Sequence, residues 1–322
     1  MSLWVKVGAR LHLGQLDLNG SLGRLYGGLG LAIDQPCLEI TAEKKNDLVI
    51  LGPEKEKKRL QRLVRKYLDF YGLPGVRLEL LESLPMHSGL GSGTQLALAV
   101  GFAITRVYGL APAVTELAVI TDREGSRSGI GVAAFEQGGF FIDGGMCTNI
   151  IRQTGLFEVP PILARTPFPE EWAIILALPH KEEEMFGQEE VKAFASLPPM
   201  AEEISGMICR LLLMKLLPSL MEKDLVSFGQ AVTEIQKRIG SHFTPVQGGI
   251  YASKAGADVA AYLLRQGAAG VGQSSWGPTI YAFTSRDKKT DLLEKTRNFL
   301  GKRGLVWTAS GRNQGVSWGW KE

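Results

Sequence analysis

Cysteine is scarce in this sequence. Among its 322 residues are three cysteines, Cys37, Cys147 and Cys209, which lie far apart and include no C-x-x-C pair. This spacing argues against a disulfide framework and against a cysteine-based zinc site, and it fits a reducing compartment. The first residues, "MSLWVKVGARLH", lack the apolar region of a signal peptide. We therefore expect a cytoplasmic protein.

A strong excess of one charge and long apolar runs are also missing. The 36 Lys and Arg exceed the 33 Asp and Glu by three, which is too little to indicate a nucleic-acid or membrane partner. No run reaches 18 uncharged apolar residues, so we expect no membrane-spanning helix. The densest basic run, "EKEKKRLQRLVRK" at 54–66, alternates with helically spaced leucines, and we interpret it as a solvated helix face.

Glycine, by contrast, is abundant, with 39 residues clustered in short loops. The stretch "PMHSGLGSGTQ" at 85–95 opens directly onto the apolar run "LALAVGFAI". Glycines let the backbone bend until the bare N–H groups of a helix start converge on one anion. The alternative is an ordinary helix cap with Ser92 as the N-cap residue. We predict a phosphate site, whose members are Ser88, Gly89, Gly91, Ser92, Gly93 and Thr94.

The pattern of elements predicts an α+β fold. Strands are expected at 3–14, 36–44, 75–82 and 173–179, and helices at 60–71, 92–108 and 253–267. We read "VAAFEQGGFFIDGG" at 132–145 as two short strands around Gly138 and Gly139, and residues 200–238 as two helices broken at Pro218. The length favours two domains, and Pro167 and Pro169 suggest a division into residues 1–167 and 168–322.

Three motifs resemble those of the GHMP superfamily, the galacto-, homoserine, mevalonate and phosphomevalonate kinases. "PMHSGLGSG" resembles the second motif of that superfamily, with Gly93 in place of its last serine. "VGARLHLGQLD" at 7–17 lies where the first motif stands, and "GVGQSSWGPTIYAF" at 270–283 resembles the third. The resemblance implies an amino-terminal domain like ribosomal protein S5 domain 2 and a ferredoxin-like carboxy-terminal domain.

A narrower resemblance is to the β-ribofuranosylaminobenzene 5'-phosphate synthase family. The stretches that carry it are "RLHLGQLDLNGSLGRLYGGLGLAID", "SGLGSGTQLALAVG" and "RSGIGVAAFEQGGFFIDGG". It implies a pentosyltransferase of methanopterin biosynthesis. That family condenses 5-phosphoribosyl 1-pyrophosphate (PRPP) with 4-aminobenzoate or 4-hydroxybenzoate and releases carbon dioxide and pyrophosphate. The alternative is an ATP-dependent small-molecule kinase, although Gly131 stands where many of these kinases carry an aspartate.

Candidate catalytic residues follow from the stretch that best matches the synthase family. We predict that Arg24 holds the benzoate carboxylate with its planar guanidinium and that Asp17 orients Arg24, binds the ring substituent or stabilises the cationic transition state. The alternative is a loop in which Asp17 forms an Asx-turn and Arg24 is a surface residue.

The remaining candidates bind substrate or metal. The predicted substrate-binding residues are Arg10, His12, Arg127, Ser274 and Ser275, with Arg127 assigned to the 5-phosphate. Glu136 and Asp143 flank the Gly138–Gly139 turn, and either could hold Mg²⁺, which prefers one or two carboxylates together with substrate phosphates. No organic cofactor is expected, because the para substituent of the ring can take up the charge that develops on the ring. Superfamily relatives are often dimers, so the resemblance also implies a homodimer.

Overall fold

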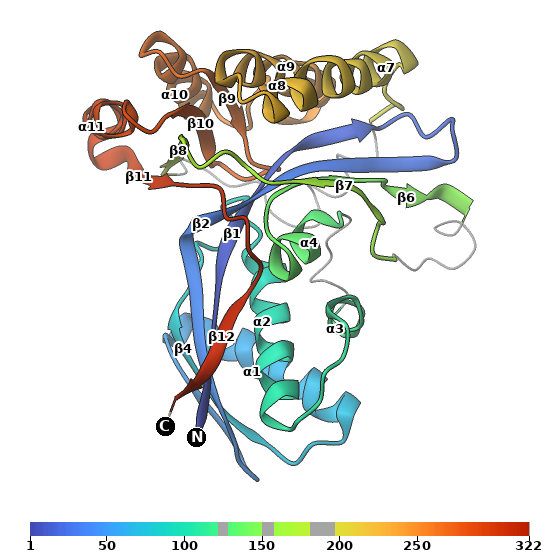
Figure 1. Cartoon of the computed structure of the whole chain (residues 1–322), viewed down its shortest axis with the longest axis vertical. Coiled ribbons are helices and arrows are strands. Elements are labelled where there is room, and N and C mark those ends of the chain that lie inside the picture. The colour runs from blue at the N-terminus through green and yellow to red at the C-terminus, as the bar shows by residue number, and fades with distance from the viewer. Residues whose placement is uncertain (122–127, 150–157, 181–196, 322) are drawn as a thin grey trace.

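Two β-sheets with helices packed on them make up the molecule (Figure 1). The computed structural model describes residues 1–121, 128–149, 158–180 and 197–321. The larger sheet runs in the order β12-β1-β2-β4-β3, and β5, β6 and β7 extend it from β2. Its strands are β1 (Ser2–Asp17), β2 (Arg24–Lys44), β3 (Leu48–Leu51), β4 (Val76–Glu82), β5 (Phe140–Asp143), β6 (Met146–Cys147), β7 (Ile162–Thr166) and β12 (Ser317–Lys321).

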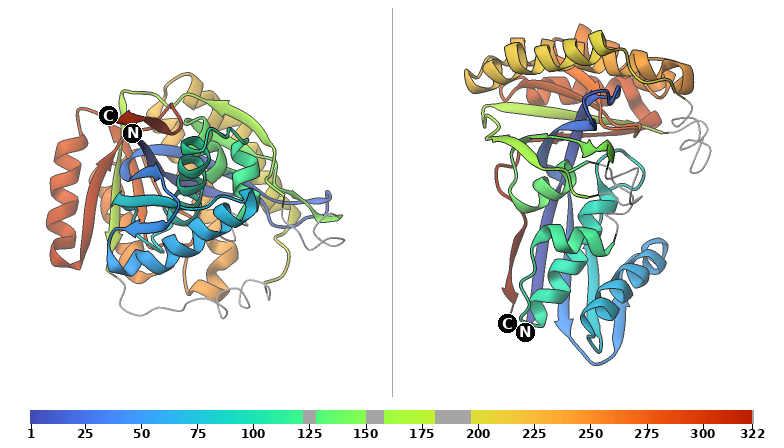
Figure 2. Two further views of the ribbon diagram at one scale, coloured as in Figure 1. Left: turned by 90° about the horizontal axis from the view of Figure 1, so that it is seen from below. Right: turned by 90° about the vertical axis from the view of Figure 1, so that its right-hand side faces the viewer.

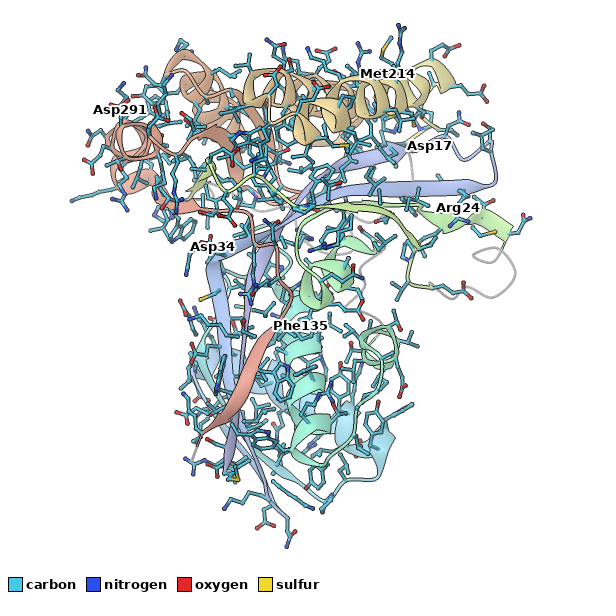
Figure 3. All side chains as sticks on the ribbon, in the orientation of Figure 1. Asp17, Arg24, Asp34, Phe135, Met214 and Asp291 are labelled. Carbon is cyan, nitrogen blue, oxygen red and sulfur yellow. The ribbon has the colours of Figure 1, made fainter. Side chains whose placement is uncertain are left out.

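The long antiparallel pair β1 and β2 organises the site. Its register runs from Leu3 opposite Ala42 to Asp17 opposite Tyr26. Residues 39–44 of β2 pair with β4, whereas residues 29–31 pair with β5. The end of the pair extends to one side of the molecule, where β6 pairs with Arg24 and Leu25 (Figures 1 and 3), and we call residues 14–27 the arm.

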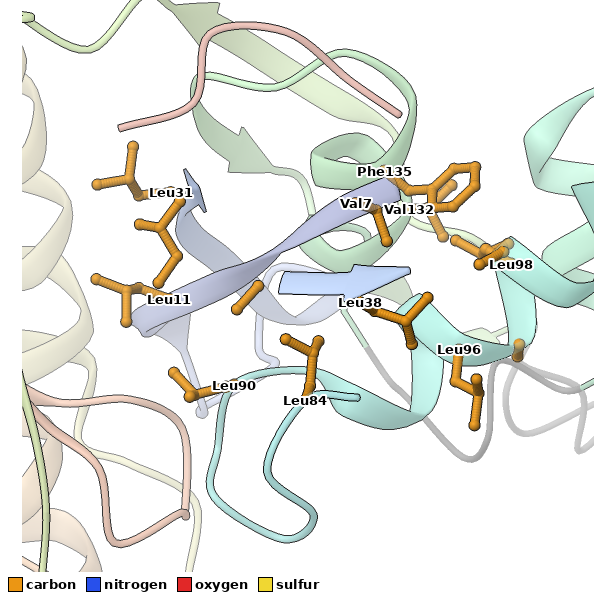
Figure 4. Packing of buried hydrophobic residues seen from close by; sticks show 14 of the residues in the cluster. Val7, Leu11, Leu31, Leu38, Leu84, Leu90, Leu96, Leu98, Val132 and Phe135 are labelled. Atoms are coloured by element: carbon orange, nitrogen blue, oxygen red, sulfur yellow. The ribbon is translucent and has the colours of Figure 1, made fainter. Parts of the chain in front are cut away.

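Four of the helices that the structure describes cover one face of the larger sheet. They are α1 (Glu54–Tyr71), α2 (Ser92–Val107), α3 (Val114–Ile120) and α4 (Ile130–Glu136). Helix α2 is apolar on nearly all sides and is buried over most of its length, as expected of a central helix. Side chains of β1 and β2 pack against α2 and α4 in one continuous core (Figure 4).

The smaller sheet has the ferredoxin-like arrangement. Its strands are β8 (Trp172–Pro179), β9 (Gly270–Gln273), β10 (Ile280–Ser285) and β11 (Gly304–Ala309). They are antiparallel in the order β11-β8-β10-β9, the fourth, first, third and second along the chain. The accompanying helices are α7 (Glu202–Leu211), η2 (Leu212–Leu216), α8 (Leu217–Met221), α9 (Leu225–Gln247), α10 (Lys254–Arg265), α11 (Lys289–Leu300) and η3 (Gly301–Arg303).

The two sheets share buried structure. One apolar cluster includes Leu11 of β1, Ile174 of β8 and Phe228 of α9. The last strand, β12, returns to pair with β1, so the two termini lie together (Figure 1). The expected α+β fold is confirmed. The division into residues 1–167 and 168–322 stays a prediction.

Two expectations about elements were wrong. Residues 132–136 belong to helix α4, not to a strand, because a short, wholly buried apolar run has no periodicity that separates the two structures. The helical segment also continues through Pro218 and ends at Met221, and α9 begins after the N-cap residue Asp224. The π-helical turn η2 precedes the proline, and such a turn relieves the backbone conflict that proline creates.

One described helical stretch, Glu202–Met221, is long and apolar enough to cross a membrane, with 33% of its most apolar window buried. Length and composition alone are weak grounds for a membrane span. Ile208, Leu212 and Leu216 of this stretch are buried in the main core, so its apolar side packs against the rest of the protein.

Candidate active site

A cavity of about 1400 Å³ lies where the arm, the glycine loop and α9 meet. The residues of the arm that line it are Gly14, Gln15, Leu18, Asn19, Leu25, Tyr26 and Gly27. The glycine loop contributes Met86, His87, Gly89, Gly91, Ser92, Gly93 and Thr94. Gln236, His242 and Phe243 of α9 and Ser275 and Trp276 of the third motif lie on further sides. All three sequence motifs therefore reach one cavity.

The start of α2 has the backbone geometry and the charge that an anion site requires. The helix begins at Ser92 after Gly91, which has a left-handed backbone (φ 80°), and no side chain caps its first turn. Gly89 has the same φ of 80°, which disfavours any residue with a Cβ. The first turn contains no acidic residue, so nothing opposes the positive end of the helix dipole. Ser92 is the first helical residue and not the cap.

Ser88 and Ser274 hold the loop instead of facing the cavity. The Ser88 hydroxyl donates to the Pro85 carbonyl at 2.7 Å, and Ser274 donates to the Gly89 carbonyl at 2.7 Å while it accepts from the His12 amide at 3.1 Å. Ser274 is fully buried. A Cβ at Gly89 would collide with the Ser274 carbonyl oxygen, so the second and third motifs meet backbone to backbone.

Two buried leucines fix the glycine loop to the core. Leu84 and Leu90 are 2% and 0% exposed and point into the core beside β1 (Figure 4). The Leu90 carbonyl also accepts a bond from the Arg10 amide at 3.1 Å. The loop is thus held in place before any ligand arrives, which is the property that an electrostatic site requires.

Arg10 and His12 both reach the cavity, as predicted, from the buried part of β1. The Arg10 guanidinium donates to the Gly89 carbonyl. Burial lowers the pKa of Arg10 to about 10, so it keeps its charge at neutral pH. Burial, and then the charge of Arg10, lowers the pKa of His12 to about 3. The glycine loop is therefore bonded to one charged guanidinium, that of Arg10, and the neutral imidazole of His12 lines the same cavity.

Asp17 and Arg24 lie on the two strands of the arm (Figure 3). The Oδ1 of Asp17 accepts from the amides of Asn19 at 2.6 Å and Gly20 at 3.2 Å, which is an Asx-turn. Arg24 is exposed and donates to the carbonyls of Gly144 and Gly145 at 2.6 and 2.8 Å. Neither is among the described residues that line the cavity, although their neighbours Leu18 and Leu25 are. Their catalytic roles stay predictions.

Asp143 is a buried carboxylate at the edge of the cavity, 1% exposed. Its two oxygens accept from the amides of Gly28, Gly129 and Gly145 and from the Ser128 hydroxyl, at 2.8–3.0 Å. Glu136 is exposed and outside the lining, next to Gln137. Within the described ranges no three His, Cys, Asp or Glu side chains gather as metal ligands.

Two further predicted residues complete this account. Ser275 lines the cavity, and its amide donates to the His12 carbonyl at 3.0 Å. Arg127 lies outside the described residues, so its assignment to the 5-phosphate stays a prediction.

The basic run of α1 is the main feature that the sequence interpretation missed. Four of its cations line the cavity: Lys55, Lys58, Arg59 and Arg62. Their spacing places them on one helix face, but periodicity cannot tell a face toward solvent from a face toward a cavity.

Comparisons with known proteins agree with this architecture. The GHMP kinases N terminal domain matches residues 58–139, and the GHMP kinases C terminal domain matches residues 216–302. The crystal structure of homoserine kinase from Cytophaga hutchinsonii superimposes with a TM-score of 0.69 at 21% identity, over 98% of this chain and 97% of that chain. A mevalonate kinase structure gives a TM-score of 0.68 at 12% identity, over 97% and 99%. These likenesses show the fold.

Full-length sequence relatives narrow the assignment. The chain is 35% identical to a β-ribofuranosylphenol 5'-phosphate synthase of Archaeoglobus fulgidus over 98% of both chains. It is 36% identical to one of Methanocaldococcus jannaschii over 94% of both, whereas a homoserine kinase of Methanocella arvoryzae is 24% identical over 89%. At this identity and coverage, the chain belongs to the β-ribofuranosylphenol 5'-phosphate synthase family of the GHMP superfamily.

Proposed function

We propose that the chain is a C-ribosyltransferase that joins PRPP to 4-hydroxybenzoate and releases carbon dioxide and pyrophosphate in methanopterin biosynthesis. The names of the synthase relatives specify a ribofuranosylphenol product, and a para-hydroxybenzoate is the ring acid that yields a phenol when it loses its carboxylate. 4-Aminobenzoate would give an aniline instead. The substrates are small molecules, and we place the reaction in the cytoplasm of a cell that makes methanopterin.

One observation carries this proposal. The start of α2 has no side-chain cap, follows glycines with a left-handed backbone, and lines a strongly cationic cavity. Among the described lining residues, Arg10 and the four cations of α1 face a single carboxylate, Asp143. That carboxylate is already engaged by four hydrogen-bond donors. Such a cavity suits a substrate with several phosphate groups.

The chemistry needs a held leaving group and an aligned ring. The bond from C1 of the ribose to the pyrophosphate oxygen breaks, and the oxygen keeps the electron pair. The ring carbon that carries the carboxylate attacks C1, and the new carbon–carbon bond forms. The pair of the bond to the carboxylate then restores the aromatic ring as carbon dioxide leaves. Holding both reactants in register can supply roughly 7–11 kcal/mol of the barrier.

The amides at the start of α2 would stabilise the charge that develops on pyrophosphate, since they are fixed before the reaction. The neutral His12 and the uncharged side chains of Gln15 and Tyr26 line the cavity where the arm meets it. We place the aromatic ring at this end. The para hydroxyl donates electron density to the ring during attack and so stabilises the positive charge that develops there, and no organic cofactor is required.

A kinase is the alternative, and one position weighs against it. Gly131 lies buried in α4, and a Cβ there would lie 3.0 Å from the Thr94 side chain. The aspartate that many GHMP kinases use at this point would therefore require the Thr94 side chain to shift by a few tenths of an ångström. Phosphoryl transfer depends on such positioning.

We propose that any Mg²⁺ enters with the diphosphate. The protein supplies little for a metal cage, because Asp143 is fully hydrogen-bonded and Glu136 is exposed away from the cavity. Mg²⁺ commonly keeps several waters and binds substrate phosphates. The homodimer stays a prediction.

The decisive experiment measures both released products. The protein is incubated with PRPP and 4-hydroxybenzoate labelled in the carboxyl group, and carbon dioxide and pyrophosphate are followed. We expect equal release of the two, with faster turnover than for 4-aminobenzoate. ATP consumption with a panel of small alcohols and no labelled carbon dioxide would instead establish a kinase.

A further inference from the structure

Helix α1 presents a row of cations to the same cavity as the glycine loop. Lys55, Lys58, Arg59 and Arg62 lie three, one and three residues apart, a spacing that places all four on one helix face over two turns. The opposite face is apolar: Leu60, Leu63 and Val64 are fully buried. We call these four cations the α1 face.

The orientation of this face is fixed by packing. The Tyr67 hydroxyl lies 2.9 Å from the carbonyl oxygens of both Ala97 in α2 and Leu117 in α3. Gly101 of α2 lets the Tyr67 ring approach, because a Cβ there would overlap the ring. Helix α1 therefore lies directly beside α2 (Figure 2), with its cations turned toward the cavity that the start of α2 shares.

The charge of the cavity exceeds what the glycine loop needs. Arg10 and the amides at the start of α2 are the donors of the anion site that we propose at the loop. The α1 face adds four more cations on a separate element, of which Arg59 lies 4.0 Å from the buried carboxylate of Glu56. The proposed donor carries two separate anionic groups, a diphosphate on C1 of the ribose and a phosphate monoester on C5. A second cationic element matches the second group.

We propose that the α1 face is a second phosphate subsite that holds the 5-phosphate monoester of the ribosyl donor, while the glycine loop holds the diphosphate. This inference rests on the proposed function. The division follows from the chemistry of the two groups. The diphosphate gains charge as it leaves, so it requires donors that are fixed in advance, and backbone amides satisfy that need. The monoester keeps its charge throughout the reaction, so long side chains suffice to anchor it.

Binding of fragments tests the division without any turnover. Ribose 5-phosphate and pyrophosphate are titrated separately by calorimetry into the wild-type protein and into the double variant Lys55→Ala/Lys58→Ala. Both lysines are exposed, so the substitutions leave the core intact. We expect the Kd for ribose 5-phosphate to rise at least tenfold and the Kd for pyrophosphate to change less than twofold.

A matched control removes the same charge from the same helix. Arg65 and Lys66 are exposed residues of α1 outside the described lining of the cavity. Arg65→Ala/Lys66→Ala should leave the Kd for ribose 5-phosphate within twofold of wild type. Equal weakening in the two double variants would overturn the subsite, because net charge alone would explain it. Weaker pyrophosphate binding with unchanged ribose 5-phosphate binding would also overturn it.

Failure of the proposed function would look different. If wild type binds both fragments, the α1 variant loses only ribose 5-phosphate and no carbon dioxide is ever released from a benzoate, the reaction is wrong and the subsite stands. If carbon dioxide and pyrophosphate are released but the α1 variant binds ribose 5-phosphate normally, the reaction stands and the subsite is wrong.

Discussion

At the scale of single residues, Gly91 links backbone strain to the anion site. Its φ of 80° suits glycine, and a Cβ there would lie 3.0 Å from Cγ and 3.1 Å from Nε of Arg10. We predict that Gly91→Ala lowers the free energy of unfolding by about 1–2 kcal/mol and weakens pyrophosphate binding at least tenfold. Denaturant unfolding and calorimetric titration measure the two effects.

Gly109 offers a matched control just past the other end of α2. It has a φ of 76°, and nothing lies within 4 Å of a Cβ placed there. Gly109→Ala should cost a similar free energy through its backbone alone and leave pyrophosphate binding unchanged. Equal loss of binding in both variants would remove the glycine loop from the anion site.

His12 makes stability depend on pH. Its pKa is about 3 in the folded protein, lowered first by burial and then by Arg10, and about 6.5 when unfolded. Between these values only the unfolded chain takes up the proton, so stability is full above pH 7 and falls as the pH drops. At pH 5 the loss from this group is about 2 kcal/mol.

The variant His12→Gln should therefore lose about 2 kcal/mol less than wild type between pH 7.5 and pH 5. Urea unfolding at each pH measures the difference. His180→Gln is the control, because His180 is exposed and outside the described lining. A wild-type slope in His12→Gln would show that the imidazole is not held neutral in the folded protein.

At the scale of elements, Tyr67 fixes α1 against α2 and α3 through its hydroxyl. Tyr67→Phe leaves two buried carbonyl oxygens without this partner, and we predict a loss of about 1–2 kcal/mol in the free energy of unfolding. Tyr71→Phe on the same helix removes an exposed bond to Glu116, and we expect about 0.5 kcal/mol or less. Thermal or urea unfolding of the pair gives the comparison, and equal losses would contradict the anchoring role.

Elements with a clear period could be predicted, and those without one could not. The leucines of α1 and the alternation in β4 indicated a helix and a strand, and both are present. Helix α4 was missed because every side chain from Ile130 to Phe135 is buried, which erases the polar positions that a period needs. The path through Pro218 depends on the π-helical turn before it, and no local pattern marks such a turn.

At the scale of the whole molecule, the order of the three motifs predicted the fold and the glycine loop. Each motif contains glycines at fixed spacings, and such glycines mark a particular backbone conformation in the sequence. Their mutual contacts could not be predicted. Ser274 was expected to meet substrate, yet it ties β1 and the glycine loop together across 185 residues of sequence from Gly89. The cations of α1 also line the cavity although three of the four are exposed, and only tertiary packing decides that this solvated helix face borders a cavity.

The junction between the sheets should make the chain unfold as one unit. Gln236 of α9 donates to the Leu13 carbonyl of β1 and accepts from the Gln273 amide of β9. Gln236→Met leaves both backbone groups buried without this partner, and we predict a loss of about 2–4 kcal/mol. Because one apolar core spans both sheets, circular dichroism and tryptophan fluorescence should report a single coincident transition in wild type. Gln230→Met, at an exposed position of the same helix, should change stability by less than about 0.5 kcal/mol. Two separate transitions in wild type would contradict this and would mean that the two sheets unfold independently.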